Sequence, residues 1–170
     1  MKPYPKYKAT NIPWLPEVPE GWEVKSVRVL FSENTNINTE METSNALQFQ
    51  FGEIIPKKRL ETEDNLIRYT IVETDDIIVN GLNLNYDFLT QRVAIVKEKG
   101  AITPVYIALR PQKRINPMYA CFLLKAMDSQ KLINGMGTGI RLTLSFSEFK
   151  KTNLPVPPLD IQNLIVNFLD

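Results

Sequence analysis

The sequence predicts an α+β fold, with a mixed, mostly antiparallel sheet, a few flanking helices and the start of a C-terminal helix. Short apolar runs recur between residues 47 and 109 and are separated by polar turns, as is typical of short strands. Asn116-Pro117 precedes an apolar stretch, and this pair is typical of a helix start. An amphipathic stretch follows a proline run near the end of the chain and predicts the last helix.

The N-terminal segment is expected to be an extended arm over residues 1–21, because it carries five of the twelve prolines. Trp14 and Trp22 are expected to pack this arm onto the domain. Residues 22–31 have apolar positions near helical spacing, which indicates a short helix or a passage from strand to helix. Residues 32–45 are rich in Asn, Thr and Glu and predict a loop.

The middle of the chain predicts strands followed by one helix. Strands are expected over residues 47–51, 68–72, 76–80, 91–96 and 105–109. The connecting segments are polar or contain glycine, so loops are expected over 56–64, 73–75, 81–89 and 97–104. The helix is expected over 118–128, with Tyr119, Phe122, Leu123 and Ala126 buried.

Glycine and proline mark the segment before the last helix. Gly135, Gly137 and Gly139 precede a basic residue, Arg141, and Ser147 suits the cap of a short helix. Residues 154–158 are expected to be extended, because proline disfavours the helical region for the residue before it.

The last helix carries one apolar face. Its residues recur at i, i+3, i+4 and i+7: Ile161, Leu164, Ile165 and Phe168. A helix this short is marginal alone, so we expect this face to be an assembly interface or the helix to continue past residue 170. Self-association through this helix is one form that the assembly would take.

Composition excludes several kinds of site. The chain has no histidine and one cysteine, Cys121, within an apolar run. An internal disulfide is therefore impossible, and zinc sites and Ser-His or Cys-His catalysis are not expected. No apolar run is long enough for a membrane span and the first residues are polar, so we expect a cytoplasmic protein with no membrane partner.

Enzyme motifs are not found either. Pro157-Pro158 is the only double proline, and its neighbours Val156 and Leu159 do not make the Asn/Asp-Pro-Pro-aromatic motif of a DNA methyltransferase. Glu73, Asp75 and Asp76 lie close together but lack the spacing of a magnesium-dependent nuclease, and a solvated turn is the preferred interpretation. We therefore expect no catalysis, no cofactor and no metal site.

Charge is distributed unevenly along the chain. Residues 33–87 carry 11 acidic and 4 basic residues, whereas residues 91–151 carry 11 basic and 3 acidic residues. Such asymmetry indicates a face that binds a polyanion, although charged stretches are also ordinary solvated surface. On charge alone, solvated surface is the preferred interpretation, and double-stranded DNA is the candidate polyanion.

Three segments have the residue types that contact DNA, namely Arg or Lys for guanine and phosphate and Asn or Gln for adenine. The first contains Asn80, Asn83, Asn85, Tyr86, Gln91 and Arg92; the second contains Thr138, Gly139 and Arg141; the third contains Lys57, Lys58 and Arg59. The asparagines also suit turns, and the lysines also suit a solvated loop. Arg141 is expected to contact phosphate, because glycines beside a cation permit close backbone approach.

Three pieces of the chain resemble one protein family. Residues 154–162 read Leu-Pro-Val-Pro-Pro-Leu-Asp-Ile-Gln, and residues 12–22 read Ile-Pro-Trp-Leu-Pro-Glu-Val-Pro-Glu-Gly-Trp. With residues 76–80 and 100–111, they resemble the target-recognition domain of the specificity (S) subunit of type I restriction–modification enzymes. One position departs from the family pattern, since Ile161 stands where Glu is usual before the Gln.

The resemblance implies a non-catalytic subunit that recognises one half of a bipartite DNA site. It would direct methyltransferase (M) and restriction (R) subunits to that site. The implied organisation is the arm over 1–21, a DNA target-recognition domain over 22–158, and the truncated start of a conserved spacer helix over 159–170.

Two alternatives remain open at this stage. The chain could be a non-catalytic interaction module, a truncated paralogue that binds methyltransferase subunits without reading DNA. It could also be the recognition domain of a fused restriction–methylation enzyme.

Overall fold

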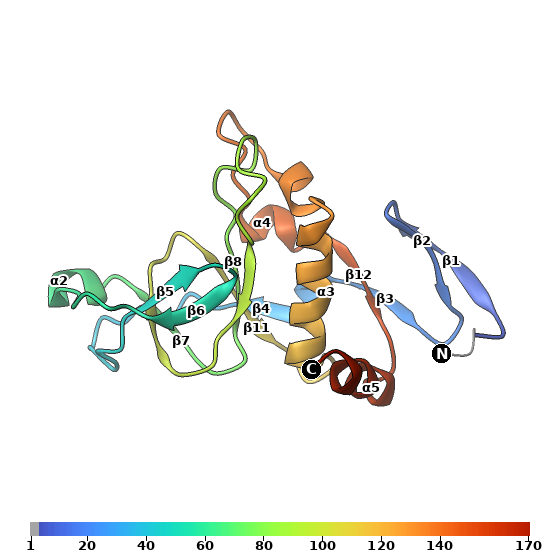
Figure 1. Ribbon diagram of the computed structural model, residues 1–170, viewed down its shortest axis with the longest axis horizontal. Coiled ribbons are helices and arrows are strands. Elements are labelled where there is room, and N and C mark those ends of the chain that lie inside the picture. The colour runs from blue at the N-terminus through green and yellow to red at the C-terminus, as the bar shows by residue number, and fades with distance from the viewer. Residues whose placement is uncertain (1–3) are drawn as a thin grey trace.

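A four-stranded antiparallel sheet forms the centre of the computed structural model, which describes residues 4–170 (Figure 1). The strands lie in the order β4 (Phe31–Glu33), β11 (Ile107–Pro111), β8 (Ile77–Val79) and β9 (Val93–Ile95). In the register, Ile77 lies opposite Leu109 on one side and Ile95 on the other. The predicted α+β class is confirmed.

Both faces of this sheet are buried, which explains why β8 is apolar at every position. Ile77 and Val79 face the main core, which includes Leu124 of helix α3 (Pro117–Ser129). Ile78 faces a second core with Leu47 and other residues of the smaller strand pairs. The sheet is therefore a rigid platform from which loops project at both ends of its strands.

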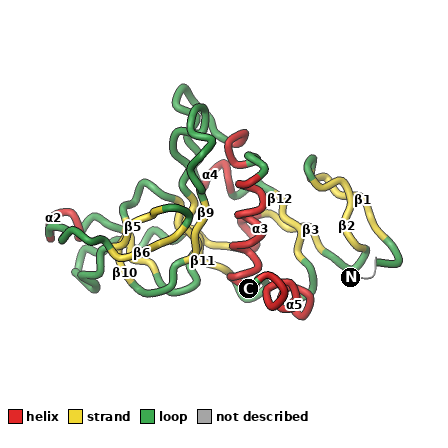
Figure 2. The backbone as a smooth tube through the Cα atoms, in the orientation of Figure 1, coloured by secondary structure: helices red, strands yellow, loops and turns green. Residues whose placement is uncertain are grey.

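Two small antiparallel strand pairs contribute to the second core. They are β5 (Leu47–Gln50) with β6 (Glu53–Pro56), and β7 (Thr70–Val72) with β10 (Gly100–Ile102). The short helix α2 (Glu63–Leu66) lies at this end of the molecule, opposite the N-terminal hairpin (Figure 2).

The strand partners differ from chain order. The consecutive strands β7 and β8 do not pair with each other, since β7 pairs with β10 and β8 lies between β11 and β9. β10 lies within residues 97–104, where the sequence predicts only a loop, so that prediction is wrong for Gly100–Ile102. These three residues are fully buried between other elements, and so short a strand has no alternating pattern to reveal it.

Helix α3 begins as the sequence predicts, since the Asn116 side-chain oxygen accepts hydrogen bonds from the amides of Met118 (2.9 Å) and Tyr119 (3.1 Å). Its buried face is partly different from the prediction. Tyr119 is buried, but Phe122 and Leu123 are only half-buried and Ala126 is exposed. The other buried apolar residues of the helix are Ala120, Cys121, Leu124 and Met127. Apolar residues surround much of this helix, so the sequence pattern does not determine which stripe faces the sheet.

The N-terminal arm is extended and not helical over its described part, as predicted. It forms a hairpin of β1 (Tyr7–Ile12) and β2 (Leu15–Pro19), while residues 1–3 of the predicted arm lie outside the described residues. Trp14 packs on the main core and Trp22 contacts Tyr4 edge-on, with ring centroids 6.2 Å apart.

After the arm, the strand-to-helix passage is confirmed, from β3 (Glu23–Ser26) into α1 (Val27–Leu30). The extended proline run is also confirmed, as β12 (Asn153–Val156), which pairs with β3.

A 3-10 turn, η1 (Ile133–Met136), and a short helix, α4 (Phe146–Phe149), precede β12. The cap of α4 is Ser145 and not Ser147. In this capping box, the Glu148 carboxylate accepts a hydrogen bond from the Ser145 amide (2.8 Å). The last helix, α5 (Leu159–Leu169), follows the prolines and lies near the first turn of α3 (Figure 1).

Candidate nucleic-acid interface

Two of the three candidate segments lie side by side, although about fifty residues separate them in the sequence. The Leu84 amide donates to the Leu142 carbonyl (3.1 Å), and the Leu144 amide donates to the Gly81 carbonyl (2.9 Å). We call residues 80–92 and 137–144 the paired loops. They project from the C-terminal end of α3, at the top of Figure 1.

Glycines permit this close pairing. A Cβ atom on Gly81 would lie 2.5 Å from the Leu144 carbonyl oxygen, and one on Gly137 would lie 2.8 Å from Leu84 Cδ1. Both contacts are far tighter than a side chain tolerates, so these positions require glycine. At Gly137 the close approach is therefore between two loops of the protein. Gly139 has φ +75° and open space around it, so its role is to turn the chain.

Arg92 is buried at the base of the paired loops, which corrects its prediction as a DNA contact. Its guanidinium donates to four backbone carbonyls: Asn80 (3.1 Å), Leu82 (2.7 Å), Asn83 (3.4 Å) and Asp87 (2.5 Å). The four carbonyls belong to the turn that the other candidate residues occupy. Arg92 is therefore a structural residue that fixes the shape of the first paired loop.

Two further buried polar residues complete this support. Asp128 of α3 accepts the Arg92 amide (2.7 Å), and Asn134 donates to the carbonyls of Leu84 (3.0 Å) and Asp87 (3.0 Å). We call Arg92, Asp128 and Asn134 the buried frame. Asp128 and Asn134 have no recognisable signal in the sequence, because each occurs singly and belongs to no motif.

The Asp87 side chain organises the end of the same loop. Its carboxylate accepts the amides of Thr90 (3.0 Å) and Leu89 (3.2 Å), and hydrogen bonds from Thr90 hold its pKa below the ordinary value. It also lies 4.0 Å from Arg92. The loop backbone is thus held by side chains that point inward.

The asparagines divide into turn residues and an exposed residue. Asn80 accepts the Leu82 amide (3.1 Å), and Asn83 has a left-handed φ of 56° and accepts the Tyr86 hydroxyl (2.7 Å). Turn chemistry therefore accounts for these two positions. Asn85 is exposed, and its side chain forms no hydrogen bond within residues 4–170. Tyr86 and Gln91 are also exposed.

The second paired loop exposes Thr138, Gly139 and Arg141. The Thr138 hydroxyl already donates a hydrogen bond to Glu148 (3.0 Å), so its proton is not free for another acceptor. Arg141 is exposed, and within the described part of the chain it forms none of the observed ion pairs. Its guanidinium is therefore available to an anion next to the first loop.

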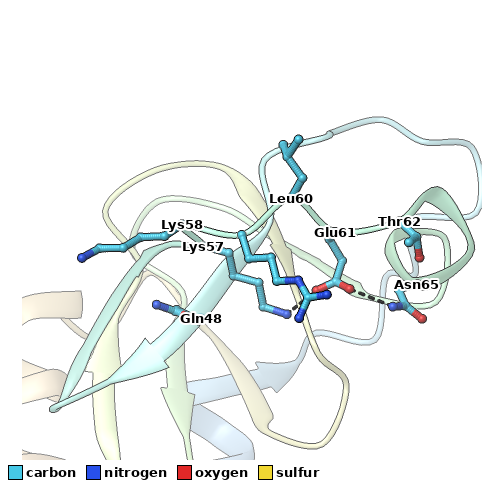
Figure 3. A pocket seen from close by; sticks show the side chains of 8 residues that line it. Gln48, Lys57, Lys58, Leu60, Glu61, Thr62 and Asn65 are labelled. Carbon is cyan, nitrogen blue, oxygen red and sulfur yellow. Dashed lines mark hydrogen bonds and ion pairs between the residues drawn. The ribbon is translucent and has the colours of Figure 1, made fainter.

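The third candidate segment lies elsewhere, at the far end of β6, where Lys57, Lys58 and Arg59 border a pocket of about 590 Å³ (Figure 3). Lys57 donates to Glu61 and to the Tyr69 hydroxyl (3.0 Å), so its charge is already paired. Lys58 and Arg59 are exposed. The structure therefore gives two separate basic surfaces.

Glu61 gives a direct test of the pairing in this pocket. Hydrogen bonds from Lys57 and from Asn65 (2.7 Å) lower its pKa from 4.5 to about 2. A lowered pKa means that the pairing stabilises the fold above pH 4.5 and that this contribution is lost as the pH falls towards 2. We expect Lys57→Met to raise the Glu61 pKa towards 4.5 in a carboxyl NMR titration. Lys58→Met is the control, and equal Glu61 titrations in both variants would contradict the assignment.

The acidic turn at residues 73–76 is solvated at Asp75, which is exposed, and partly at Glu73, but the prediction is wrong for Asp76. Asp76 is buried and binds the Arg110 guanidinium through two contacts of 3.0 and 2.9 Å. It also accepts hydrogen bonds from Asn34 (3.0 Å) and the Glu73 amide (3.0 Å). Within residues 4–170, no group of three or more His, Cys, Asp or Glu side chains could hold a metal ion.

The predicted apolar face of α5 is divided between two environments. Ile165 packs on the main core and Ile161 is half-buried, whereas Leu164 and Phe168 are 61% and 80% exposed. Gln162, on the same helix, is fully buried. The face is therefore not one continuous interface, and its outer part consists of Leu164 and Phe168.

Gln162 anchors this helix to the start of α3. Its side-chain oxygen accepts the Asn116 amide (2.8 Å), and its nitrogen donates to the carbonyls of Pro157 (2.8 Å) and Arg114 (3.3 Å). This contact explains why a glutamine follows the proline run at this spacing.

No helix among residues 4–170 is both long and apolar enough to cross a membrane.

Comparisons with known proteins concern the family and the fold of this chain. The model of the type I restriction modification DNA specificity domain matches residues 19–170. No curated protein matches the chain by sequence. A crystal structure of the HsdS subunit from Thermoanaerobacter tengcongensis has a TM-score of 0.59 at 16% identity, and covers 90% of this chain and 37% of that one.

Two other solved structures have the same fold. An S subunit of the type I system from M. genitalium has a TM-score of 0.58 at 14% identity, over 87% of this chain and 38% of that one. A chain from a study of type I complex assembly has a TM-score of 0.62 at 15% identity, over 90% and 38%. The chain thus spans little more than a third of the length of these structures. Because the family model covers most of its residues, the chain belongs to the type I restriction modification DNA specificity domain family.

Proposed function

We propose that this chain is a sequence-specific DNA-binding target-recognition domain that recognises one half of a bipartite site. The observation that carries the proposal is the buried frame, which holds the backbone of the first paired loop and leaves Asn85, Tyr86 and Gln91 exposed. Base reading needs exposed polar side chains on a loop of fixed shape, because a mobile loop loses binding energy in becoming ordered. Family membership supports the same function.

The exposed residues suit different parts of DNA. Asn85 and Gln91 carry amides, which pair with the donor and acceptor of adenine in the major groove. Arg141 suits phosphate, because it lies on a neighbouring loop with open space at Gly139. Lys58 and Arg59 are a second phosphate contact at the other basic surface. The domain supplies binding and no catalysis, and methyltransferase and restriction subunits perform the reactions.

Salt dependence tests the electrostatic part of this proposal. We expect DNA affinity to fall steeply with salt, with a log–log slope of about −0.9 per phosphate contact. Arg141→Ala is expected to weaken binding to selected and random duplexes alike and to reduce the slope by about one contact. The measurement is fluorescence anisotropy at several salt concentrations.

Two variants serve as comparisons for Arg141→Ala. Lys113→Ala removes the same charge at the opposite end of α3, about 20 Å away along the helix axis, and should change little. Asn85→Ala should cost about 1–3 kcal/mol on a selected duplex and little on a random one. A salt-independent affinity would defeat the electrostatic interface, and equal losses on both duplexes would defeat base reading by Asn85.

The outer part of α5 is proposed to bind methyltransferase subunits or a second copy of this chain. Leu164 and Phe168 are large, apolar and exposed on an anchored helix, a combination typical of an interface. We expect Leu164→Glu with Phe168→Glu to abolish assembly while the domain remains folded, as measured by sedimentation with and without methyltransferase subunits. Asn167→Glu is the matched control on the same helix. Unchanged assembly of the double variant would show that α5 is not the interface.

Binding of methyltransferase subunits without any DNA preference would favour the non-reading interaction module. A longer gene product that carries methylation motifs would favour a fused restriction–methylation enzyme.

A further inference from the structure

The β5–β6 turn places an aromatic residue where the backbone does not favour one. Phe51 and Gly52 have φ values of 50° and 73°, so both central residues of this two-residue turn are left-handed. Asn-Gly is the preferred pair for such a turn, and a bulky residue at this φ is disfavoured. Phe51 is also 85% exposed, so packing within the domain does not compensate for this cost. Its side chain therefore points to a function outside the fold.

The β5–β6 turn is held in place by residues of α3 and of the first paired loop. Lys125 of α3 donates to the Gly52 carbonyl (3.2 Å). The Gln91 side chain is packed so closely that a Cβ atom on Gly52 would lie 2.0 Å from its oxygen. The Phe51 backbone is thus held against α3 and the first paired loop, and the ring projects from a rigid base.

A second exposed apolar side chain lies beside it. Leu89 is 94% exposed, and its amide is held by Asp87 (3.2 Å). Phe51, Leu89, Thr90 and Gln91 line one depression of about 330 Å³. Two apolar side chains from different elements therefore meet next to a candidate base-reading amide.

The surroundings of this pair are cationic. Gln91 also lines an adjacent depression of about 250 Å³ with Lys125, Ser129, Lys131 and Asp128, and the Asp128 carboxylate already accepts the Arg92 amide. Lysines and a hydroxyl suit phosphate groups, so the surface joins apolar side chains to an anion-binding border. An apolar protein partner would not require that border, whereas duplex DNA offers apolar base surface between rows of phosphates.

We propose that Phe51 and Leu89 form an apolar base-contact element that presses against duplex DNA beside the bases read by Gln91. Apolar side chains contact DNA bases in two ways, by packing on a thymine methyl group or by entering a partly unstacked base step. Both uses bury base surface and neutralise no phosphate. This element rests on the proposed DNA-binding function and adds specificity-determining residues to it.

The test uses the full chain and a duplex selected from a random-sequence pool. Phe51→Asn places the preferred residue in the turn, so the variant should melt at the same or a higher temperature. We expect it, and Leu89→Ala, to weaken binding to the selected duplex about tenfold or more, with random-duplex affinity and the salt slope unchanged. Val29→Ala, an exposed apolar residue on α1, should change neither.

Two further experiments distinguish packing on a thymine methyl group from entry into an opened base step. Replacing thymine by deoxyuridine in the selected duplex weakens binding if Phe51 or Leu89 packs on a methyl group. 2-Aminopurine in the selected site brightens on binding if a base step opens. Selected-duplex affinity that is unchanged by Phe51→Asn overturns the apolar element alone, as does a negative result in both experiments. A parent chain that binds no DNA, or selects no sequence, overturns the proposed function and this element together.

Discussion

Arg92→Met is expected to lower the free energy of unfolding by about 3 kcal/mol or more, although Arg92 lies in a region proposed to bind DNA. Methionine fills similar volume but leaves four carbonyl oxygens of the first paired loop without their donor. A buried polar group that loses its partner costs about 1–3 kcal/mol, and the loop can recover part of this by opening to water. Urea unfolding should show a lower midpoint with an unchanged m-value.

Two controls separate this effect from loss of charge. Arg92→Lys keeps the charge, but one ammonium group cannot reproduce the planar fork that reaches several carbonyls, so most of the loss should remain. Arg141→Met removes an exposed arginine from the neighbouring loop and should change stability by less than about 0.5 kcal/mol. An Arg92→Met variant as stable as Arg141→Met would show that the guanidinium does not hold the loop.

Gln162→Leu is expected to cost about 2–4 kcal/mol, because three backbone groups lose their partner at once. These groups are the Asn116 amide and the carbonyls of Pro157 and Arg114. The variant should also lose stability locally. Amide hydrogen exchange should accelerate more in α5 and in the first turn of α3 than in the central sheet.

Gln162→Glu is an informative second variant, because it keeps the acceptor for Asn116 but loses the donor to the two carbonyls. It should be at least as destabilised as Gln162→Leu, since a buried carboxylate would then face carbonyl oxygens. Asn163→Ala is the control on the same helix, because it removes only an exposed hydrogen bond to Asn116 (2.8 Å). Equal stability of Gln162→Leu and Asn163→Ala would contradict the anchoring role.

Local signals were sufficient for several elements of the fold. The cap of α3 depends on Asn116 and the residues that follow it directly, so the sequence predicts the start of that helix. The extended proline run is also local, because proline restricts its own backbone and that of the residue before it. Strand partners are not local, which is why β7 pairs with β10 and not with β8.

In the candidate interface, too, features set by neighbouring residues could be predicted and features set by distant residues could not. Composition indicated which loops carry DNA-contacting residue types, but their pairing through Leu84 and Leu142 joins distant segments. Arg92 could not be assigned from sequence, since an arginine before a strand is as compatible with an exposed edge as with a buried base. Its role depends on four carbonyls that converge only in the folded chain.

Arg92 binds backbone carbonyl oxygens of the first paired loop, so side-chain substitutions in that loop need not disturb its shape. Every amino acid has a carbonyl, so the contacts of Arg92 do not depend on which side chains the loop carries. Substitutions at Asn85 or Tyr86, whose side chains point to solvent, leave these contacts in place. The first paired loop can therefore accumulate side-chain substitutions while its supporting architecture stays intact, and under the proposed function such substitutions would change which DNA sequence it prefers.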